Sequence, residues 1–534
     1  MSNKNTINRN YRNLLTNRNL FVIIFAICIY LRLINIISEQ LWEDEAFSIV
    51  LASSPDNIFW RRAIGDIYPP LYYLLLRGWI LMFGNSVFST RLLSAIFSIL
   101  TLPILYLIGK EIKDEKLALI IIFLYSISPF SIYYANEVRA YSLIHLLFTI
   151  SLYFGIKCLK SPNNLKNYLF LSLTGSLLIY THYMGFIYYG IVLLGIIIFN
   201  KKEKSVFKKV FFSLIITIIS YIPWMPYAVS DLLGGAHGYA GGALNLISLS
   251  YWAFNFFLGP VPSKINDPYV LKLIILTFLI NIPLMILSVI SLIGVIIIFQ
   301  NRDDFDFKAI FFFIILLTVL LFGISIITGF IIVNSFTSKN IIGGLTLIHI
   351  VEAFGLYQLF YNKNISKSEI KIFKIISILL SKILAKKLIY SIIIILLVFN
   401  IIIYPIFRAF YLQKPDWDGC IKKLKQKFEK NDIIILCYPG GPYSDVMKYY
   451  SDLNDFDLKG NFDDLNYDKG EIEEFFEDIL KENITRIWII TFWENYRDPK
   501  DKTDDMVVDK YNLEEIKEYN FRLDIRLTLY ELPQ

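Results

Sequence analysis

The chain has 534 residues, of which 55% are hydrophobic, 16% aromatic and 18% charged, and its mean hydropathy is +0.53. These values exclude a soluble globular protein and indicate a polytopic membrane protein. The net charge of +6 is explained by where the basic residues lie along the chain, so it does not indicate a nucleic-acid partner.

The first apolar run, residues 19–37, is followed by two adjacent acids. Its only charged residue is Arg32. A transmembrane helix needs about 20 predominantly apolar residues, so Asp44 and Glu45 in the string SEQLWEDEAFS are expected at the membrane face opposite the N-terminus. Acids at a membrane surface often belong to a solvated loop, and residues further along the chain decide against that interpretation here.

Further apolar runs follow, and together they predict about eleven transmembrane helices. The count is open because residues 71–83 and 269–299 are ambiguous and 371–385 could form an interfacial helix. The predicted spans are 19–37, 92–109, 117–134, 141–157, 167–181, 184–199, 207–222, 269–299, 308–332, 341–361 and 388–405.

Alternate connections between these runs are basic. They are the N-terminal tail and residues 110–116, 157–166 and 201–209, whereas the intervening connections are long, aromatic and poor in lysine. The positive-inside rule places the basic connections in the cytoplasm. The sequence therefore predicts a cytoplasmic tail (1–18), a transmembrane catalytic domain (19–407) with a first outer loop (38–91), and an extracytoplasmic domain (408–534).

The C-terminal region differs in composition from the rest of the chain. Strand-like pieces (DIIILCYP, RIWIITF and FRLDIRLTLYEL) alternate with helical patterns (CIKKLKQKFEK and EIEEFFEDILKE). This alternation predicts a small α/β domain. Cys420 and Cys437 could form a disulfide there if they face each other, but the four cysteines of the chain show no metal-binding spacing.

Most of the ionisable residues near span ends collect on the predicted outer side. Ionisable groups near a membrane are costly, so each is a candidate functional residue. Each also has a structural explanation: Asp66 could cap a turn, His182 could be an interfacial histidine, and Lys339 could extend to the lipid headgroups. The candidates come from five separate elements: Asp44 and Glu45, Asp66 with the neighbouring Tyr68, Glu137 and Arg139, His182, and Lys339.

Carboxylates and cations at one membrane face suit the transfer of a sugar from a polyprenyl phosphate. The departing phosphate is a weak base and needs positive charge rather than a proton, a role suited to Arg139 and Lys339, with His182 beside them. The acceptor hydroxyl needs a carboxylate to take its proton, a role suited to Asp44. One base without a second, nucleophilic carboxylate predicts a single displacement with inversion at the anomeric carbon.

Several strings resemble one family of membrane glycosyltransferases. WEDEAFS, IYPPLYYLLLRGW, RLLSAIFSILTLPILYLIGKEI, SPFSIYYANEVRAYSL and YTHYMGF occur in the order and spacing typical of protein-mannosyltransferase-like enzymes, the GT-C class of glycosyltransferase family 39 that includes the lipid A aminoarabinose transferases. The resemblance covers residues 20–200. It implies a polyprenyl-phosphate sugar donor, an acidic pair matching Asp44 and Glu45, and a phosphate-binding arginine matching Arg139.

The chain departs from the family pattern at two positions. Many members have histidine where this chain has Tyr68, and many have Arg-Tyr where this chain has Lys339-Asn340. Lysine keeps the charge but loses the guanidinium fork, so a phosphate contact there is expected to be weaker. Some relatives bind a divalent ion near the first loop, for which Asp66 and His237 are the candidates here, but no metal site or other cofactor is assigned.

We therefore interpret the sequence as a polytopic α-helical GT-C membrane protein with a small extracytoplasmic α/β domain. It is expected to act at the outer face of the cytoplasmic membrane on a glycan, lipid or protein acceptor, with Asp66, Tyr68 and Glu137 contacting substrate. Two alternatives remain: a polymerase or ligase of lipid-linked glycans, and a flippase of lipid-linked sugars. A transporter is expected to show internal repeats and mid-membrane charges, and the sequence shows neither.

Overall fold

The computed structural model describes most of the N-terminal half and several later segments. The chain forms two compact units. The first comprises Met1–Ile36, Trp60–Leu75 and Arg91–Tyr411, and the second Ile37–Phe59, Leu76–Thr90 and Leu412–Gln534. Apart from isolated positions, the described residues are 16–66, 68–233, 285–292, 305–331, 338–361, 416–429, 432–437, 443–450, 458–461, 486–492, 514–521 and 525–531.

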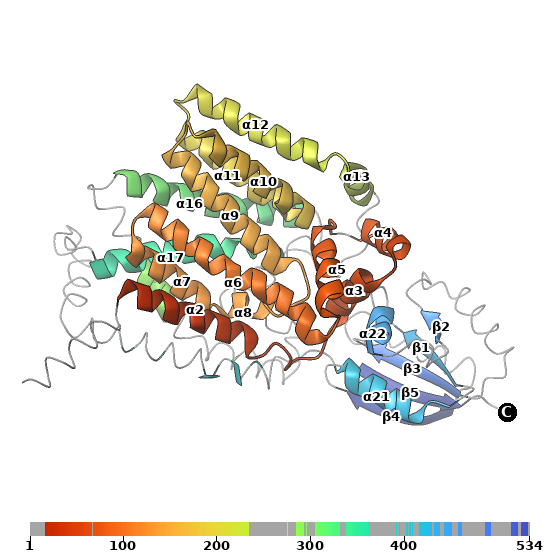
Figure 1. The fold of residues 1–534 in the computed structure, drawn as a ribbon. Coiled ribbons are helices and arrows are strands. Elements are labelled where there is room, and N and C mark those ends of the chain that lie inside the picture. Colours follow the sequence, from red (N-terminus) through yellow and green to blue (C-terminus); the bar gives the residue numbers. More distant parts are fainter. Residues whose placement is uncertain are drawn as a thin grey trace, which may run out of the picture. The chain divides into compact units, whose positions relative to one another are not determined.

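The first unit is built from helices. Helix α10 packs against α9, α11 and α12, and α7 packs against α2 and α17 (Figure 1). The described helices that contribute to this unit are α2 (Asn17–Leu33), α4 (Asp56–Ile64), α5 (Leu71–Phe83), α6 (Val87–Ile112), α7 (Glu115–Ile127), α8 (Pro129–Tyr134), α9 (Tyr141–Lys160), α10 (Leu165–Thr181), α11 (Met184–Phe199), α12 (Lys204–Tyr221), α13 (Met225–Leu233), α16 (Phe305–Ile331), the 3-10 turn η1 (Ser338–Ile341) and α17 (Gly344–Tyr361).

The helices of this unit carry apolar side chains on their outer surfaces. Phe170, Phe211, Ile219 and Val319 are exposed, which suits contact with lipid rather than water. Among the described residues, three helices are long and apolar enough to cross a membrane: Val87–Ile112, Tyr141–Lys160 and Ala309–Ile327. The predicted count of eleven stays a prediction, because most of the predicted spans 269–299 and 388–405 lie outside the described residues.

The basic connections predicted to be cytoplasmic gather at one end of the helical unit. Lys157 pairs with Glu111 at 3.1 Å, which joins connections 110–116 and 157–166. Lys209 donates to Asn163 Oδ1 at 3.0 Å, which joins connection 201–209 to 157–166. Their shared location is what the positive-inside rule requires of loops on one side of a membrane.

The predicted span 117–134 is interrupted. Helix α7 ends at Ile127 and α8 begins at Pro129. Ser128 between them has an extended backbone (φ −66°, ψ 115°) because the residue before a proline is sterically pushed out of the helical region. The short helix α8 leads directly into the turn that carries Glu137 and Arg139.

A buried arginine joins the helices around this break. The Arg32 guanidinium donates to Ser98 Oγ at 2.8 Å and to Ser131 Oγ at 2.7 Å, so it connects α2, α6 and α8. It also donates to the carbonyls of Cys28, Tyr125 and Ser126. A buried charge is tolerable when its hydrogen bonds are satisfied in this way, and we assign Arg32 a structural role.

The second unit contains a five-stranded sheet with strand order β2-β1-β3-β5-β4. The strands are β1 (Asp432–Cys437), β2 (Leu458–Asn461), β3 (Arg486–Phe492), β4 (Glu514–Phe521) and β5 (Ile525–Glu531). Strand β1 is parallel to β2 and β3, whereas β5 is antiparallel to β3 and β4. Helix α21 (Trp417–Lys427) contacts β4 and β5, and α22 (Tyr443–Tyr450) packs against α3 (Glu43–Ser53).

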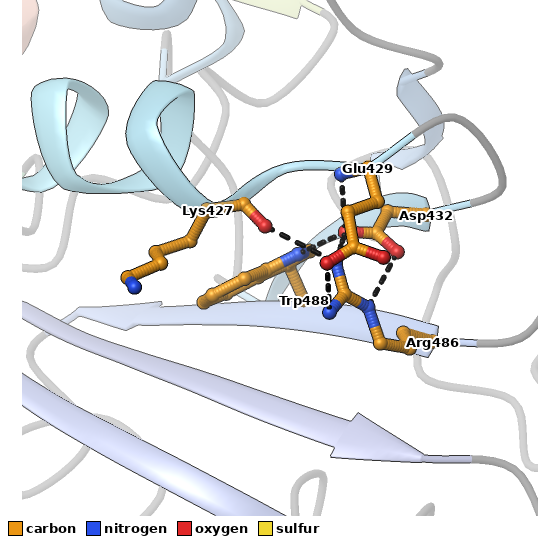
Figure 2. Close-up of polar contacts among 5 residues, drawn as sticks. All are labelled: Lys427, Glu429, Asp432, Arg486 and Trp488. Atoms are coloured by element: carbon orange, nitrogen blue, oxygen red, sulfur yellow. Dashed lines mark hydrogen bonds and ion pairs between the residues drawn. The ribbon is translucent and has the colours of Figure 1, made fainter.

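A hydrogen-bonded carboxylate links β1 to β3. Asp432 accepts from Arg486 Nε at 2.8 Å, from Arg486 Nη2 at 2.6 Å and from Trp488 Nε1 at 2.8 Å (Figure 2). The Glu429 backbone N–H also donates to it at 2.8 Å. Asp432 and Trp488 are fully buried, and these bonds compensate for the loss of water around the charge.

The predicted α/β character of the C-terminal region is confirmed. The structure has strands at 432–437, 486–492 and 525–531 and a helix at 417–427, close to the predicted positions. The predicted helix EIEEFFEDILKE lies outside the described residues. The disulfide considered for Cys420 is not formed, because its thiol is buried and free.

Candidate active site

A buried turn between α8 and α9 carries two of the predicted site residues. The Arg139 backbone N–H donates to the Glu137 carbonyl at 2.8 Å, and Ser142 Oγ donates to the Tyr134 carbonyl at 2.9 Å. Both bonds close the turn tightly, and residues 135–140 are all buried. Glu137 is 1% exposed and Arg139 is 5% exposed, so this turn delivers an acid and a cation into the interior of the helical unit.

The Arg139 side chain is held by a tyrosine bridge. Arg139 Nη1 donates to the Tyr73 hydroxyl at 3.2 Å, and that hydroxyl donates to Asp66 Oδ2 at 2.6 Å. Tyr73 therefore accepts from the cation and donates to the anion. The bridge fixes the orientation of the guanidinium and places Asp66 and Arg139 in one hydrogen-bonded chain.

Two aromatic rings extend this cluster. The Arg139 Cζ atom lies 4.7 Å from the centroid of the Tyr68 ring, a cation–π distance. The Tyr68 ring lies 4.7 Å from the ring of His182, centroid to centroid. Tyr68 stands where the resemblance predicted histidine, and its ring lies between a cation and an imidazole.

His182 is neutral in this environment. It follows the last residue of α10, and its Nδ1 accepts from the Met184 backbone N–H at 3.0 Å, which places the ring proton on Nε2. Burial lowers the pKa of His182 from 6.5 to about 3; Arg139 and, more weakly, Lys339 add to this effect, whereas the Asn340 side chain opposes it. His182 can therefore donate a hydrogen bond without adding a charge.

Lys339 comes from the 3-10 turn η1, far away in sequence. Its Nζ lies 5.6 Å from the centroid of the Tyr141 ring, at the first residue of α9. The turn is held by Tyr188, whose hydroxyl donates to the Asn340 carbonyl at 2.9 Å and accepts from the Gly343 N–H at 3.0 Å. Both Arg139 and, more weakly, Lys339 lower the pKa of the His182 ring.

Asp44 and Glu45 lie in the second unit, in the first turn of α3. Three consecutive acids, Glu43 to Glu45, occupy this turn, where the helix dipole favours negative charge. Their exposure differs: Glu43 is 6% exposed and Glu45 fully buried, whereas Asp44 is partly exposed. Of the three acids, Asp44 is the most exposed.

The structure thus brings six of the predicted site residues into the first unit and two into the second. Tyr68 directly contacts both Arg139 and His182, and Asp66 is linked to Arg139 through the Tyr73 hydroxyl. Sequence reasoning did not single out Tyr73 or Tyr141 as partners of the cations. The sequence carried a weak signal for Tyr73, since it follows Asp66 by only seven residues, with Pro69 and Pro70 between them.

The described residues do not assemble a metal centre. No group of three or more His, Cys, Asp or Glu side chains converges among them. Asp66 is bonded to Tyr73, and the second residue considered, His237, lies outside the described residues. Metal dependence stays an untested expectation, and no step is assigned to a metal here.

Part of the helical unit matches a known protein family. Residues 68–229 match the family described as dolichyl-phosphate-mannose-protein mannosyltransferase. This segment contains Tyr68, Glu137, Arg139 and His182. A comparison with curated protein sequences finds no match.

Solved structures share the fold over almost the whole chain. ArnT from Cupriavidus metallidurans in the apo state has a TM-score of 0.56 and 10% identity, covering 96% of this chain and 99% of its own. Its structure bound to undecaprenyl phosphate gives a TM-score of 0.54 at 12% identity, with the same coverage. The family match covers residues 68–229, and the similar structures show that the chain has the fold of ArnT.

A second solved protein has a similar fold. The oligosaccharyltransferase AglB from Archaeoglobus fulgidus, in complex with an inhibitory peptide and a dolichol-phosphate, has a TM-score of 0.51 and 12% identity. The alignment covers 97% of this chain and 74% of AglB. The predicted resemblance and the predicted helical fold with a small C-terminal α/β domain are confirmed. The number of spans, the side of the membrane on which the α/β domain lies and the roles of the individual site residues stay predictions.

Proposed function

We propose that this GT-C protein transfers a sugar from a polyprenyl-phosphate donor to an acceptor hydroxyl, with inversion, at the outer face of the cytoplasmic membrane. The observation that carries the proposal is the Arg139 cluster. A buried guanidinium, oriented by Tyr73 and Tyr68, shares its surroundings with a neutral histidine donor and with Lys339. This combination of charge and directed donors suits a phosphate.

The donor half of the reaction uses these residues. The bond between the anomeric carbon and the phosphate oxygen breaks, and its electron pair goes to the phosphate. Arg139 and Lys339 stabilise the charge that develops there, and His182 donates a hydrogen bond from Nε2. A neutral histidine suits this role because no proton has to be transferred to a phosphate that is already a weak base.

The acceptor half uses the first turn of α3. The acceptor oxygen forms the new bond to the anomeric carbon as its proton passes to Asp44. Asp44 is preferred over Glu45 because it is partly exposed whereas Glu45 is buried. We assign Asp66, Tyr68 and Glu137 to holding substrate, with Asp66 acting through Tyr73 on Arg139.

Two similar structures support the choice of donor. ArnT was captured with undecaprenyl phosphate, and AglB with a dolichol-phosphate and a peptide. The chemistry common to both lipids is a phosphate on a polyprenyl chain. The acceptor of this chain is a glycan, a lipid or a protein, and the sugar is of hexosyl or pentosyl type.

Deleting the gene tests the proposal. We expect a polyprenyl-monophosphate sugar to accumulate on the outer leaflet, and the parent gene but not Asp44→Asn to restore its consumption. The loss expected for a missing general base is about 10²- to 10⁴-fold. Accumulation of a pyrophosphate-linked oligosaccharide would instead favour a polymerase or ligase, and accumulation on the inner leaflet would favour a flippase.

A further inference from the structure

The acids of α3 are held by the C-terminal α/β domain, within a single compact unit. This unit combines Ile37–Phe59 with Leu412–Gln534, and α3 packs against α22. The proposed reaction gives no role to Glu43, the first acid of the triplet. It also gives no role to the soluble domain.

Glu43 is bonded to the first residue of α21. Trp417 Nε1 donates to Glu43 Oε1 at 2.8 Å, and both side chains are buried. An indole N–H needs an acceptor when it is buried, and a charged acceptor makes a stronger bond. Trp417 is itself placed by a cap, because the Asp416 carboxylate accepts from the Gly419 N–H at 2.9 Å.

A second contact holds the chain just before α3. The Leu41 N–H donates to the Tyr450 hydroxyl at 3.1 Å, and that hydroxyl donates to Gln40 Oε1 at 3.4 Å. Tyr450 is the last residue of α22. The helix N-terminus is therefore fixed from α21 through a side chain and from α22 through the backbone.

These two contacts determine how α3 presents its acids. Successive helix residues point about 100° apart, so anchoring Glu43 sets the direction of Asp44. We propose that Glu43, Trp417 and Tyr450 are positioning residues, and that the α/β domain serves to orient the carboxylates of α3 for transfer. This inference rests on the proposed function, in which Asp44 is the base.

The test compares two tryptophans whose indole N–H groups each donate a hydrogen bond to a buried carboxylate. Trp417→Phe removes the donor to Glu43, and Trp488→Phe removes an equivalent 2.8 Å bond to Asp432 elsewhere in the domain (Figure 2). Consumption of the accumulated donor lipid is measured in membranes of the deletion cells at equal protein levels. We expect a loss of about 10- to 100-fold for Trp417→Phe, the scale of a misplaced catalytic group, and at most a twofold loss for Trp488→Phe.

Three further measurements separate positioning from folding. Glu43→Gln keeps an acceptor oxygen for Trp417 and should retain most activity, whereas Glu43→Ala should match Trp417→Phe. The double variant Glu43→Ala with Trp417→Phe should be no worse than either single variant. Binding of undecaprenyl phosphate to the purified full-length protein should be unchanged in all of them. Equal losses for Trp417→Phe and Trp488→Phe would overturn the proposal.

Amide exchange gives a readout that does not depend on the reaction. Tyr450→Phe should accelerate hydrogen exchange at the Leu41 amide, because its acceptor is removed. Faster exchange together with full transfer activity would overturn the positioning role. If Asp44→Asn is fully active, the proposed base is wrong, and the exchange result still reports separately whether α22 holds the loop.

Discussion

The orientation of Arg139 depends on a residue that carries no charge. The Tyr73 hydroxyl connects the guanidinium to Asp66, and the Tyr68 ring lies against the same guanidinium. The cation is thus fixed in direction before any ligand binds. Pre-organisation of this kind lowers the cost of binding a phosphate and of stabilising the charge that develops on it.

Removing the Tyr73 hydroxyl tests this connection. Tyr73→Phe keeps the ring volume but loses a bond to a charged group, worth about 1.5–3 kcal/mol. We expect affinity for undecaprenyl phosphate to fall by roughly tenfold or more. Tyr72→Phe is the matched control, since its buried hydroxyl is bonded to Ser94 Oγ instead. Similar losses in the two variants would show that Tyr73 has no special role.

The low pKa of His182 predicts how the stability of the folded protein changes with pH. Its pKa in the folded protein is about 3, below the ordinary value of 6.5. The unfolded chain therefore takes up a proton below pH 6.5 that the folded protein does not, so the stability that His182 contributes is present above pH 6.5 and is lost as the pH falls towards 3.

We expect the parent to lose stability relative to His182→Asn on acidification. The expected difference is on the order of 1 kcal/mol per pH unit below pH 6. Asparagine retains an acceptor for the Met184 N–H and does not titrate. Thermal unfolding of both proteins between pH 7.5 and 4.5 measures the difference, and parallel curves would contradict a buried neutral histidine.

The sequence singled out charged candidate residues but not the uncharged side chains that contact them. Arg139, His182 and Lys339 were predicted because ionisable groups near a membrane are uncommon. Tyr73 and Tyr141 lie in runs rich in aromatic residues. Such residues are common wherever a membrane protein meets the lipid headgroups, so their presence alone does not indicate a contact with a cation. Which ring faces a cation is decided by packing between helices, and periodicity along one helix does not reveal it.

At the scale of elements, a glycine holds the turn that carries His182. A Cβ atom added at Gly185 would lie 2.4 Å from the Leu178 carbonyl oxygen and 2.8 Å from the Ile179 backbone nitrogen. Both are backbone atoms, so the junction of α10 and α11 would have to shift. We expect Gly185→Ala to lower donor use at least tenfold, because His182 lies in this junction.

Gly190→Ala in the same helix is the control. A Cβ atom there meets nothing within 4 Å, and alanine raises helix propensity by about 1 kcal/mol. We expect unchanged transfer and equal or higher thermal stability, measured on both purified variants. Normal donor use by Gly185→Ala would show that the close approach of α10 and α11 is not required.

The strands of the α/β domain were predictable to different degrees. The apolar strands β1, β3 and β5 stand out in the sequence because they are buried. Strand β4 (EEIKEYNF) was missed because it is a charged, mostly exposed edge strand, a composition that protects a sheet edge from aggregation.

The break between α7 and α8 at Ser128 was also not predicted. Pro129 lies inside an apolar run, and hydropathy does not register the change in backbone conformation at the residue before a proline.

For the whole molecule, the least tested prediction is the orientation in the membrane. Gln426 is exposed near the end of α21, and Lys202 is exposed in a predicted cytoplasmic connection. In intact cells, a membrane-impermeant maleimide should label Gln426→Cys above the parent background but should reach Lys202→Cys only after permeabilisation. Labelling of both in intact cells would mean that the basic connections do not mark the cytoplasmic side. Protection of Gln426→Cys would mean an even number of spans before the α/β domain.

We propose that the guanidinium-centred site binds the phosphate of a polyprenyl lipid. The most direct measurement is the affinity of the purified full-length protein for undecaprenyl phosphate in nanodiscs, with undecaprenol as the uncharged reference. Arg139→Lys keeps the charge but loses the planar fork, so we predict a loss of roughly 1–3 kcal/mol, about 5- to 150-fold in affinity. Arg61→Lys, at an exposed position in α4, should have no effect. Equal affinity of the parent and Arg139→Lys would show that the phosphate binds elsewhere.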